Sequence, residues 1–353
     1  MKFNKRKAIL IASGFLFFLL YVVFAARPLS EALHLEPAWT IDIAEAEVQP
    51  AAGKELLPYK LGHTLGYFTP EGAIVSRVTF PFAASISSSY WAAFLPDASR
   101  TVFYTSDGRE AGVIGGSGFP FFDEDRAFLF SPGGAAVSRI SGTGQILWTN
   151  EGYAPITSFE STPNGAVAGY ADGIIRLFSP EGAVHEVEPG GSGFPVILGA
   201  ALSPDARMVA SVSGIQGQRF ILTRVEGEVN KVVSHRYLER ETNEQVLVKF
   251  NAGGTCVYYN PLGALCVYDC LRGTTTEIPV DGAVIDVQEV PGGPFAFGLS
   301  KSGITYTVWI LEKMSKVVGS FSFEADSAFI RTSPGALYVG KNSTIAKINV
   351  SRR

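Results

Sequence analysis

The residues best suited to catalysis or metal binding are few and scattered in this sequence. The four histidines are His34, His63, His185 and His235, and no two have the H-x-x-x-H spacing of a metal site. No serine lies in the G-x-S-x-G frame of a nucleophile elbow, and no phosphate-binding P-loop occurs. We therefore expect no catalytic, cofactor-binding or metal-binding residues, and a non-catalytic protein.

The three cysteines also indicate structure rather than chemistry. The stretch TCVYYNPLGALCVYDC predicts a hairpin whose turn is Asn260 to Gly263. In that register Cys256 and Cys266 project to opposite faces of the ribbon, because side chains alternate along a strand. We expect these thiols, like that of Cys270, to be free, with burial in the core as the simplest role.

One acidic turn offers oxygen ligands. The sequence FFDEDRAF places Asp123, Glu124 and Asp125 together, and such clusters can bind Ca²⁺. The simpler interpretation is a solvated turn whose charge is balanced by Arg126. We expect the second arrangement.

The first 26 residues differ from the rest of the chain. Four basic residues precede an uncharged apolar run at 8–26, long enough to approach the ~30 Å of a bilayer core in helical form. The charge asymmetry predicts a single-pass anchor in the cytoplasmic (inner) membrane, with a cytoplasmic basic tail at 1–7 and the remainder on the periplasmic or extracellular side. A cleaved signal peptide is the alternative, although the run exceeds the usual h-region.

Charge makes nucleic acid an unsuitable partner. The chain has a formal net charge of −4, and its N-terminal basic residues leave the exported part more acidic still. Nucleic-acid binding depends on neutralising phosphates with Lys and Arg. We expect no nucleic-acid partner.

The body of the chain repeats short apolar strands separated by turns rich in Gly, Pro and Asp. The clearest unit, residues 155–189, divides into the strands ITSFES, AVAGYA, IIRLFS and AVHEVE. Its first turn, TPNG, has counterparts through the chain whose spacing is near 40 residues after a first interval of 54. Four strands per unit with this period predict an all-β, seven-bladed β-propeller.

Two features of this prediction concern the ends of the ring. The last unit lacks a fourth strand, and we expect a strand at 38–48 to pair with it and close the ring. This strand lies in a linker at 27–54, before a propeller domain at 55–353. The long first interval leaves open an eighth blade hidden there.

Several segments resemble known propeller repeats. SRISGTGQILWTN and YADGIIRLFSPEG look like parts of quinoprotein-type repeats, and ALSPDARMVASVS resembles an element of WD40-type and TolB-type repeats. The resemblance implies a propeller and, for exported members, often a binding or assembly role. No vicinal cysteine pair of the quinoprotein dehydrogenase kind is present, so no cofactor residue is carried over.

The repeat also predicts which loops share a face. The hexapeptide GGSGFP occurs at 115–120 and at 190–195, both times where a fourth strand should pass to the next first strand. We interpret it first as a structural joint. Such joints should bring aromatic and arginine side chains to one side, where they could bind a partner. These are Phe119, Tyr153, Phe194, Arg236, Tyr237 and Arg240.

Two functions remain open at this point. The first is a membrane-anchored, non-catalytic scaffold that binds a protein or peptide or assists assembly of the cell envelope. The second is a hydrolase, lyase or carbohydrate-binding propeller whose carboxylates meet in the central channel. A cluster of inward-facing acidic residues would favour the second, and a channel lined by small apolar residues would exclude it.

Overall fold

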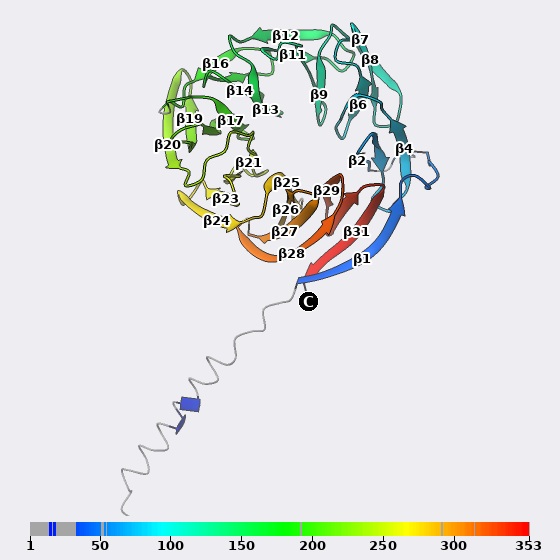
Figure 1. Cartoon of the computed structure of the whole chain (residues 1–353), viewed down its shortest axis with the longest axis vertical. Coiled ribbons are helices and arrows are strands. Elements are labelled where there is room, and N and C mark those ends of the chain that lie inside the picture. Colours follow the sequence, from blue (N-terminus) through cyan, green and yellow to red (C-terminus); the bar gives the residue numbers. More distant parts are fainter. Residues whose placement is uncertain are drawn as a thin grey trace, which may run out of the picture.

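A computed structural model describes most of the chain. It covers residues 14–15, 17–18, 33–50, 53, 55–190, 193–290, 292–313 and 315–352. The described residues form eight antiparallel sheets arranged around a central opening (Figure 1). We number these blades 1 to 8 in chain order.

The first four blades follow one another along the chain, and among the described strands blade 1 has three while blades 2 to 4 have four each. Blade 1 contains β2 (Leu57–Leu61), β3 (Thr64–Phe68) and β4 (Ile74–Thr79). Blade 2 contains β5 (Ala83–Ile86), β6 (Tyr90–Phe94), β7 (Arg100–Thr105) and β8 (Glu110–Gly115). Blade 3 contains β9 (Phe119–Asp123), β10 (Arg126–Phe130), β11 (Ala136–Ile140) and β12 (Ile146–Glu151). Blade 4 contains β13 (Ile156–Thr162), β14 (Gly165–Tyr170), β15 (Ile175–Phe178) and β16 (Val184–Val187).

The second four blades each have four strands. Blade 5 contains β17 (Ile197–Leu202), β18 (Met208–Ser213), β19 (Arg219–Glu226) and β20 (Val229–Tyr237). Blade 6 contains β21 (Val248–Phe250), β22 (Cys256–Tyr259), β23 (Ala264–Asp269) and β24 (Thr274–Pro279). Blade 7 contains β25 (Ala283–Glu289), β26 (Phe295–Ser302), β27 (Thr305–Glu312) and β28 (Lys316–Glu324). Blade 8 contains β29 (Ala328–Ser333), β30 (Ala336–Lys341), β31 (Thr344–Arg352) and the early strand β1 (Leu33–Asp42).

The prediction of seven blades is therefore wrong, and the alternative of eight is confirmed. The turn at Thr69 joins β3 to β4, so it is not the first turn of its blade, and the long first interval contains both blade 1 and blade 2. The corresponding turn of blade 2 lies between β5 and β6 and has neither Gly nor Pro. Ser87 stabilises it instead, because its Oγ accepts hydrogen bonds from the N–H groups of Ser89 (3.3 Å) and Tyr90 (3.1 Å).

The strand assignments of the clearest repeat are confirmed. The four strands expected in residues 155–189 are β13 to β16, paired in sequence order. The cysteine geometry is confirmed as well. Cys256 packs in the core between blades 6 and 7, whereas Cys266 packs between blades 5 and 6, and all three thiols are free.

The ring is closed by a strand that precedes blade 1. β1 pairs antiparallel with β31 from Leu33 opposite Arg352 to Asp42 opposite Thr344, so the strand covers 33–42 and overlaps the expected 38–48 only in part. A shared aromatic core joins blades 8 and 1 beneath this pairing. The rings of Phe68 and Tyr338 meet edge to face at 5.4 Å, and Phe329 packs against the same cluster.

Side chains of the inner strands connect neighbouring blades. Lys60 Nζ of blade 1 donates to the carbonyl of Ala84 in blade 2 at 2.8 Å. Lys249 Nζ of blade 6 donates to that of Val287 in blade 7 at 2.7 Å, and Arg331 Nε of blade 8 donates to that of Pro58 in blade 1 at 3.2 Å. These bonds satisfy polar groups that the packing of blades removes from water.

The expected membrane anchor lies almost wholly outside the described residues. Within that segment, Gly14, Phe15, Phe17 and Phe18 are helical. Among all residues with a described placement, no helix is long and apolar enough to cross a membrane. The anchor at 8–26 stays a prediction.

The two GGSGFP copies occupy equivalent joints, from β8 to β9 and from β16 to β17. The glycine at the fourth position nevertheless has different surroundings in the two copies. Gly118 has φ of +145°, and a Cβ there would collide with the carbonyl oxygen of Phe130. Gly193 would place its Cβ in open space. The first copy therefore requires glycine at its fourth position, while the second does not.

We predict that Gly118→Ala destabilises the protein by on the order of 1–3 kcal/mol, because alanine meets both a strained φ and a backbone contact. Gly193→Ala is the matched control and should change the free energy of unfolding by less than about 0.5 kcal/mol. Denaturant unfolding monitored by circular dichroism measures both. Equal losses in the two variants would contradict the difference between the joints.

Candidate functional site in the central channel

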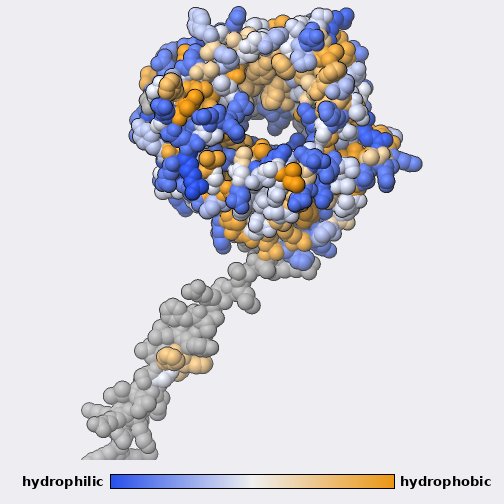
Figure 2. Space-filling model, viewed as in Figure 1, coloured by the Kyte–Doolittle hydropathy of each residue, from blue (hydrophilic) through white to orange (hydrophobic). Residues whose placement is uncertain are grey.

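A cavity of about 700 Å³ occupies one side of the central channel, which Figure 2 shows as an opening through the ring. Its walls come mainly from the inner strands of blades 3 to 7. Six ionisable side chains line it, and they are Asp123, Glu124, Arg126, Glu160, Lys249 and Asp286. The channel is therefore lined by charged side chains rather than by small apolar ones, so its lining does not exclude a ligand site.

The acidic turn of blade 3 is bound to Arg126. This arginine begins β10 and is buried, with 7% of its surface exposed. Its guanidinium donates to Asp123 Oδ2 at 2.9 Å and to Glu124 Oε2 at 3.1 Å. It also donates through Nε to Ser161 Oγ of blade 4 at 2.9 Å, and the Ser161 hydroxyl donates to Asp123 Oδ2 at 2.5 Å. The predicted pairing with Arg126 is confirmed, and it joins two blades.

Glu160 is the carboxyl group with the most altered acidity. Alternation along β13 directs Ser158 and Glu160 to the same side, where Ser158 Oγ accepts from the N–H of Ala200 (2.8 Å) and Glu160 Oε2 from that of Leu202 (2.9 Å). Burial raises the pKa of Glu160 from 4.5 to about 8, although the Leu202 N–H and the charge of Lys249 oppose the shift. At neutral pH the carboxyl group therefore keeps its proton.

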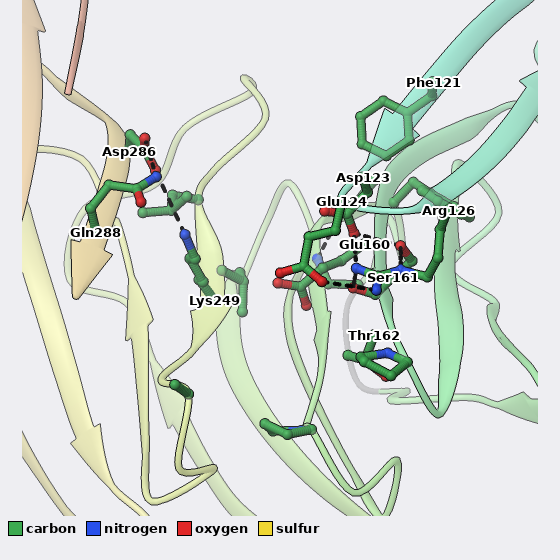
Figure 3. Close-up of a pocket in the computed structure, with 18 of the residues that line it drawn as sticks. Phe121, Asp123, Glu124, Arg126, Glu160, Ser161, Thr162, Lys249, Asp286 and Gln288 are labelled. Atoms are coloured by element: carbon green, nitrogen blue, oxygen red, sulfur yellow. Dashed lines mark hydrogen bonds and ion pairs between the residues drawn. The ribbon is translucent and has the colours of Figure 1, made fainter. Parts of the chain in front are cut away.

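The opposite wall carries a second charged group. Lys249 Nζ lies 3.7 Å from Asp286 Oδ1, and Arg331 Nη1 lies 3.7 Å from the other oxygen of Asp286. Gln288 also donates to that oxygen at 2.8 Å. Figure 3 shows this group facing the Arg126 group across open space. The cavity thus has two walls of paired charges, and Glu160, whose pKa is raised, lies on the side of the Arg126 group (Figure 3).

These residues suit hydrogen bonding to a polar ligand better than bond cleavage. Asp123 and Asp286 each have a cationic partner, and none of the four histidines lines the cavity. His63 instead contacts the carbonyl of Phe80 at 3.2 Å, and His185 contacts the Asn230 side chain at 2.7 Å. Among the described residues, no group of three or more His, Cys, Asp or Glu side chains could hold a metal ion.

The six residues expected at a partner-binding face lie elsewhere, in or beside the joints from fourth to first strands. Tyr153, Phe194 and Arg240 lie in joints, Phe119 begins β9, and Arg236 and Tyr237 end β20. Three aromatic side chains there are prominently exposed, at 95% for Tyr153, 56% for Phe194 and 58% for Tyr237. Phe119 is 44% exposed and meets Phe94 of the preceding blade edge to face at 6.4 Å.

The arginines of this set lie between blades 5 and 6. Arg236 pairs with Glu277 at 3.0 Å, and it shares a small cleft with Arg240. Arg219 lies over the ring of Tyr237 at 5.8 Å and donates to the carbonyl of Gly190, in the second GGSGFP copy. The structure thus brings Arg236 and Arg240 together, whereas Tyr237 contacts Arg219 and His235 instead. The other three residues lie in or beside three separate joints.

Glu160 was not identified from sequence, although a weak signal was present. The segment SFEST places polar residues at every second position of an inner strand, at Ser158, Glu160 and Thr162. Such alternation marks one polar side of a strand. It does not say that this side faces a channel, because that depends on how the blades surround the axis.

Comparison with known proteins agrees with the architecture. A family model described as beta-propeller protein matches residues 1–352. The chain belongs to the β-propeller protein family. An uncharacterized protein of Treponema pallidum (strain Nichols) is 30% identical to this propeller over 362 residues, which cover 99% of this chain and 96% of that one.

Two solved structures share the fold of this propeller. The crystal structure of BamB from Moraxella catarrhalis superposes with a TM-score of 0.60 at 11% identity, over 90% of this chain and 100% of that one. The computationally designed Ika8 protein superposes with a TM-score of 0.62 at 14% identity, over 87% and 98%. At these identities the likeness concerns the fold alone. The propeller resemblance seen in the sequence is confirmed.

We predict that Glu160→Gln gains stability relative to the wild type as pH rises from about 5 to about 9. A carboxyl group whose pKa is raised in the folded state stabilises the fold most at pH values below its unfolded-state pKa. This contribution is lost as pH rises through the folded-state pKa of about 8. Glutamine has no proton to lose. The melting temperature of the variant minus that of the wild type should increase over this range.

The matched control is Glu181→Gln, at an exposed turn between β15 and β16. It removes one negative charge outside the channel. A melting-temperature difference for Glu160→Gln that stays flat with pH, or follows that of the control, would show that Glu160 is ionised in the native protein at neutral pH.

Proposed function

We propose that this protein is a non-catalytic scaffold that binds a protein or peptide partner on the face formed by its fourth-to-first joints. The observation that supports this is the exposure of aromatic side chains on successive joints. Tyr153 is 95% exposed and makes no hydrogen bond or ring contact with the described residues, so folding does not explain it. Exposed aromatic and arginine side chains are the usual anchors of protein interfaces.

The proposal includes a tether to the outer side of the cytoplasmic membrane. If 8–26 spans the bilayer, only residues 27–32 separate it from Leu33, where β1 begins beside the end of β31. Six residues extend at most about 22 Å. The rim of blade 8 would therefore stay close to the membrane, and the partner would be held there with it.

A second candidate function uses the channel. Carboxyl groups from blades 3, 4 and 7 line one cavity, which favours a hydrolase, a lyase or a carbohydrate-binding protein over a sealed channel. A neutral carboxylic acid close to ionised ones is the arrangement that acid–base catalysis uses. Because the ionised members are paired with Arg126, Lys249 and Arg331, binding of a ligand rich in hydroxyl groups is the form of this candidate that the contacts support.

We predict that the double variant Tyr153→Ala, Phe194→Ala loses its membrane-associated partner. Removing two interface anchors should weaken binding by about tenfold or more without destabilising the ring. Cross-linking of the full-length chain in its native membranes, followed by quantitative mass spectrometry, measures the loss.

The matched control is Leu271→Ala. Leu271 is 84% exposed and lies between β23 and β24, a turn on the opposite face of the ring. Recovery of the same cross-linked proteins in equal amount from the double variant and from the control would reject the joint face as the binding surface.

A further inference from the structure

In the part of the chain that the structure describes, blade 1 has no outer strand. Its sheet ends at β4, whereas each of the other seven sheets of the described chain has a fourth strand. At one end of β4, Val48 forms an isolated parallel bridge with Ile74, and the N–H of Gln49 donates to the carbonyl of Ile74 at 2.8 Å. No described strand pairs with the outer side of β4 beyond that bridge.

Among the described residues, the pairing along this edge ends at the bridge. Pro50 follows Gln49 and has no N–H with which to continue the pairing. A Cβ at Gly53 would meet no heavy atom within 4 Å. No described strand pairs with the outer edge of β4 from Ser76 to Thr79, and proteins usually cover an open edge of this kind.

An apolar groove runs beside this open edge, between blades 1 and 2. Its volume is about 500 Å³, and it extends from β4 across one face of β6 and β7. Its apolar side chains include Val78, Phe82, Trp91, Leu95, Val102 and Tyr104. Phe82 is 65% exposed and Leu95 44%. Figure 2 shows apolar atoms on the upper-right part of the ring, where Figure 1 labels β6 to β8. A fourth strand of blade 1 would cover this face.

One charged group in the groove indicates what an occupant would carry. Trp91 stacks on Tyr104 at 4.6 Å and adds to the apolar surface. Arg100 lines the same groove, is exposed, and forms no ion pair with the described residues.

We propose that the outer edge of β4 binds an extended segment of a partner protein, which becomes the fourth strand of blade 1. Backbone hydrogen bonds to β4 would hold the segment. Every second side chain would be apolar and enter the groove, and an acidic side chain would face Arg100.

A second copy of this chain fits the site less well than an acidic partner. β4 reads IVSRVT and has no acidic residue, so β4-to-β4 pairing would bring Arg100 of each copy to the interface without a counter-charge. The site is separate from the joints that carry Tyr153 and Phe194, and the two surfaces can therefore be tested independently.

The experiment uses the full-length chain in nanodiscs and a fluorescent eight-residue peptide. The peptide alternates valine with threonine and has glutamate at one valine position, so that the carboxylate enters the groove that Arg100 lines, and a matched peptide has lysine there. We predict that the glutamate peptide binds and that Phe82→Ser or Arg100→Glu weakens it by about tenfold. Arg100→Glu should in turn bind the lysine peptide better than the wild type does. Fluorescence anisotropy measures all pairs.

Two controls separate strand addition from contact with an apolar surface. Methylation of alternate backbone nitrogens removes the hydrogen-bond donors along one edge of the peptide. Of the two peptides methylated at odd or at even positions, the one that loses the donors facing β4 should no longer bind. Melting temperatures of Phe82→Ser and Arg100→Glu should match the wild type, because both side chains are exposed.

Three results would overturn the proposal. The first is no binding of the glutamate peptide, and the second is binding that is independent of peptide charge and methylation. The third is a dimer of the full-length chain, seen by light scattering, that Phe82→Ser converts to a monomer, since a second copy would then occupy β4. Loss of the membrane-associated partner from the double variant Tyr153→Ala, Phe194→Ala would test the joint face only, and not the β4 edge.

Discussion

The pairing of β1 with β31 is the contact on which the rest of this structure depends. Seven sheets are continuous in sequence, but blade 8 is completed by residues from the opposite end of the chain. A ring of packed sheets has no edge only while its first and last members remain joined. The aromatic cluster of Phe68, Phe329 and Tyr338 and the bond from Arg331 to Pro58 support this closure on the inner side. The channel exists only because the ring is closed.

Joining the blades and lining the channel involve the same side chains. Ser158 and Glu160 accept backbone N–H bonds from blade 5, and Lys249 donates to blade 7, yet Glu160 and Lys249 also face the cavity. The polar character of the channel therefore has a structural cause, and it would be present without any ligand. Among the groups that line the cavity, Glu160 has the most altered acidity, because burial raises its pKa to about 8.

The N-terminal segment explains why one blade is complete and another is not. Residues 33–42 form the outer strand of blade 8, and of the described residues that follow before blade 1, only Val48 forms a bridge with β4. Arg77 binds the carbonyl groups of Ala44 (2.7 Å) and Ala46 (3.4 Å) and holds this crossing in place. One segment thus serves two blades and leaves the β4 edge open. Ring closure and the open edge have the same origin.

Local sequence determined the strands, their turns and the repeated four-strand unit, because strand alternation and turn chemistry act between near neighbours. ITSFES to AVHEVE became β13 to β16, and the acidic turn found its partner in Arg126, one residue away. Tertiary structure alone decided the number of blades, since Ser87 makes a turn without Gly or Pro. It also decided that Glu160, Lys249 and Asp286 share a cavity and that β4 lacks a neighbour. Those relations join residues far apart in the chain, and only closure of the ring brings them together.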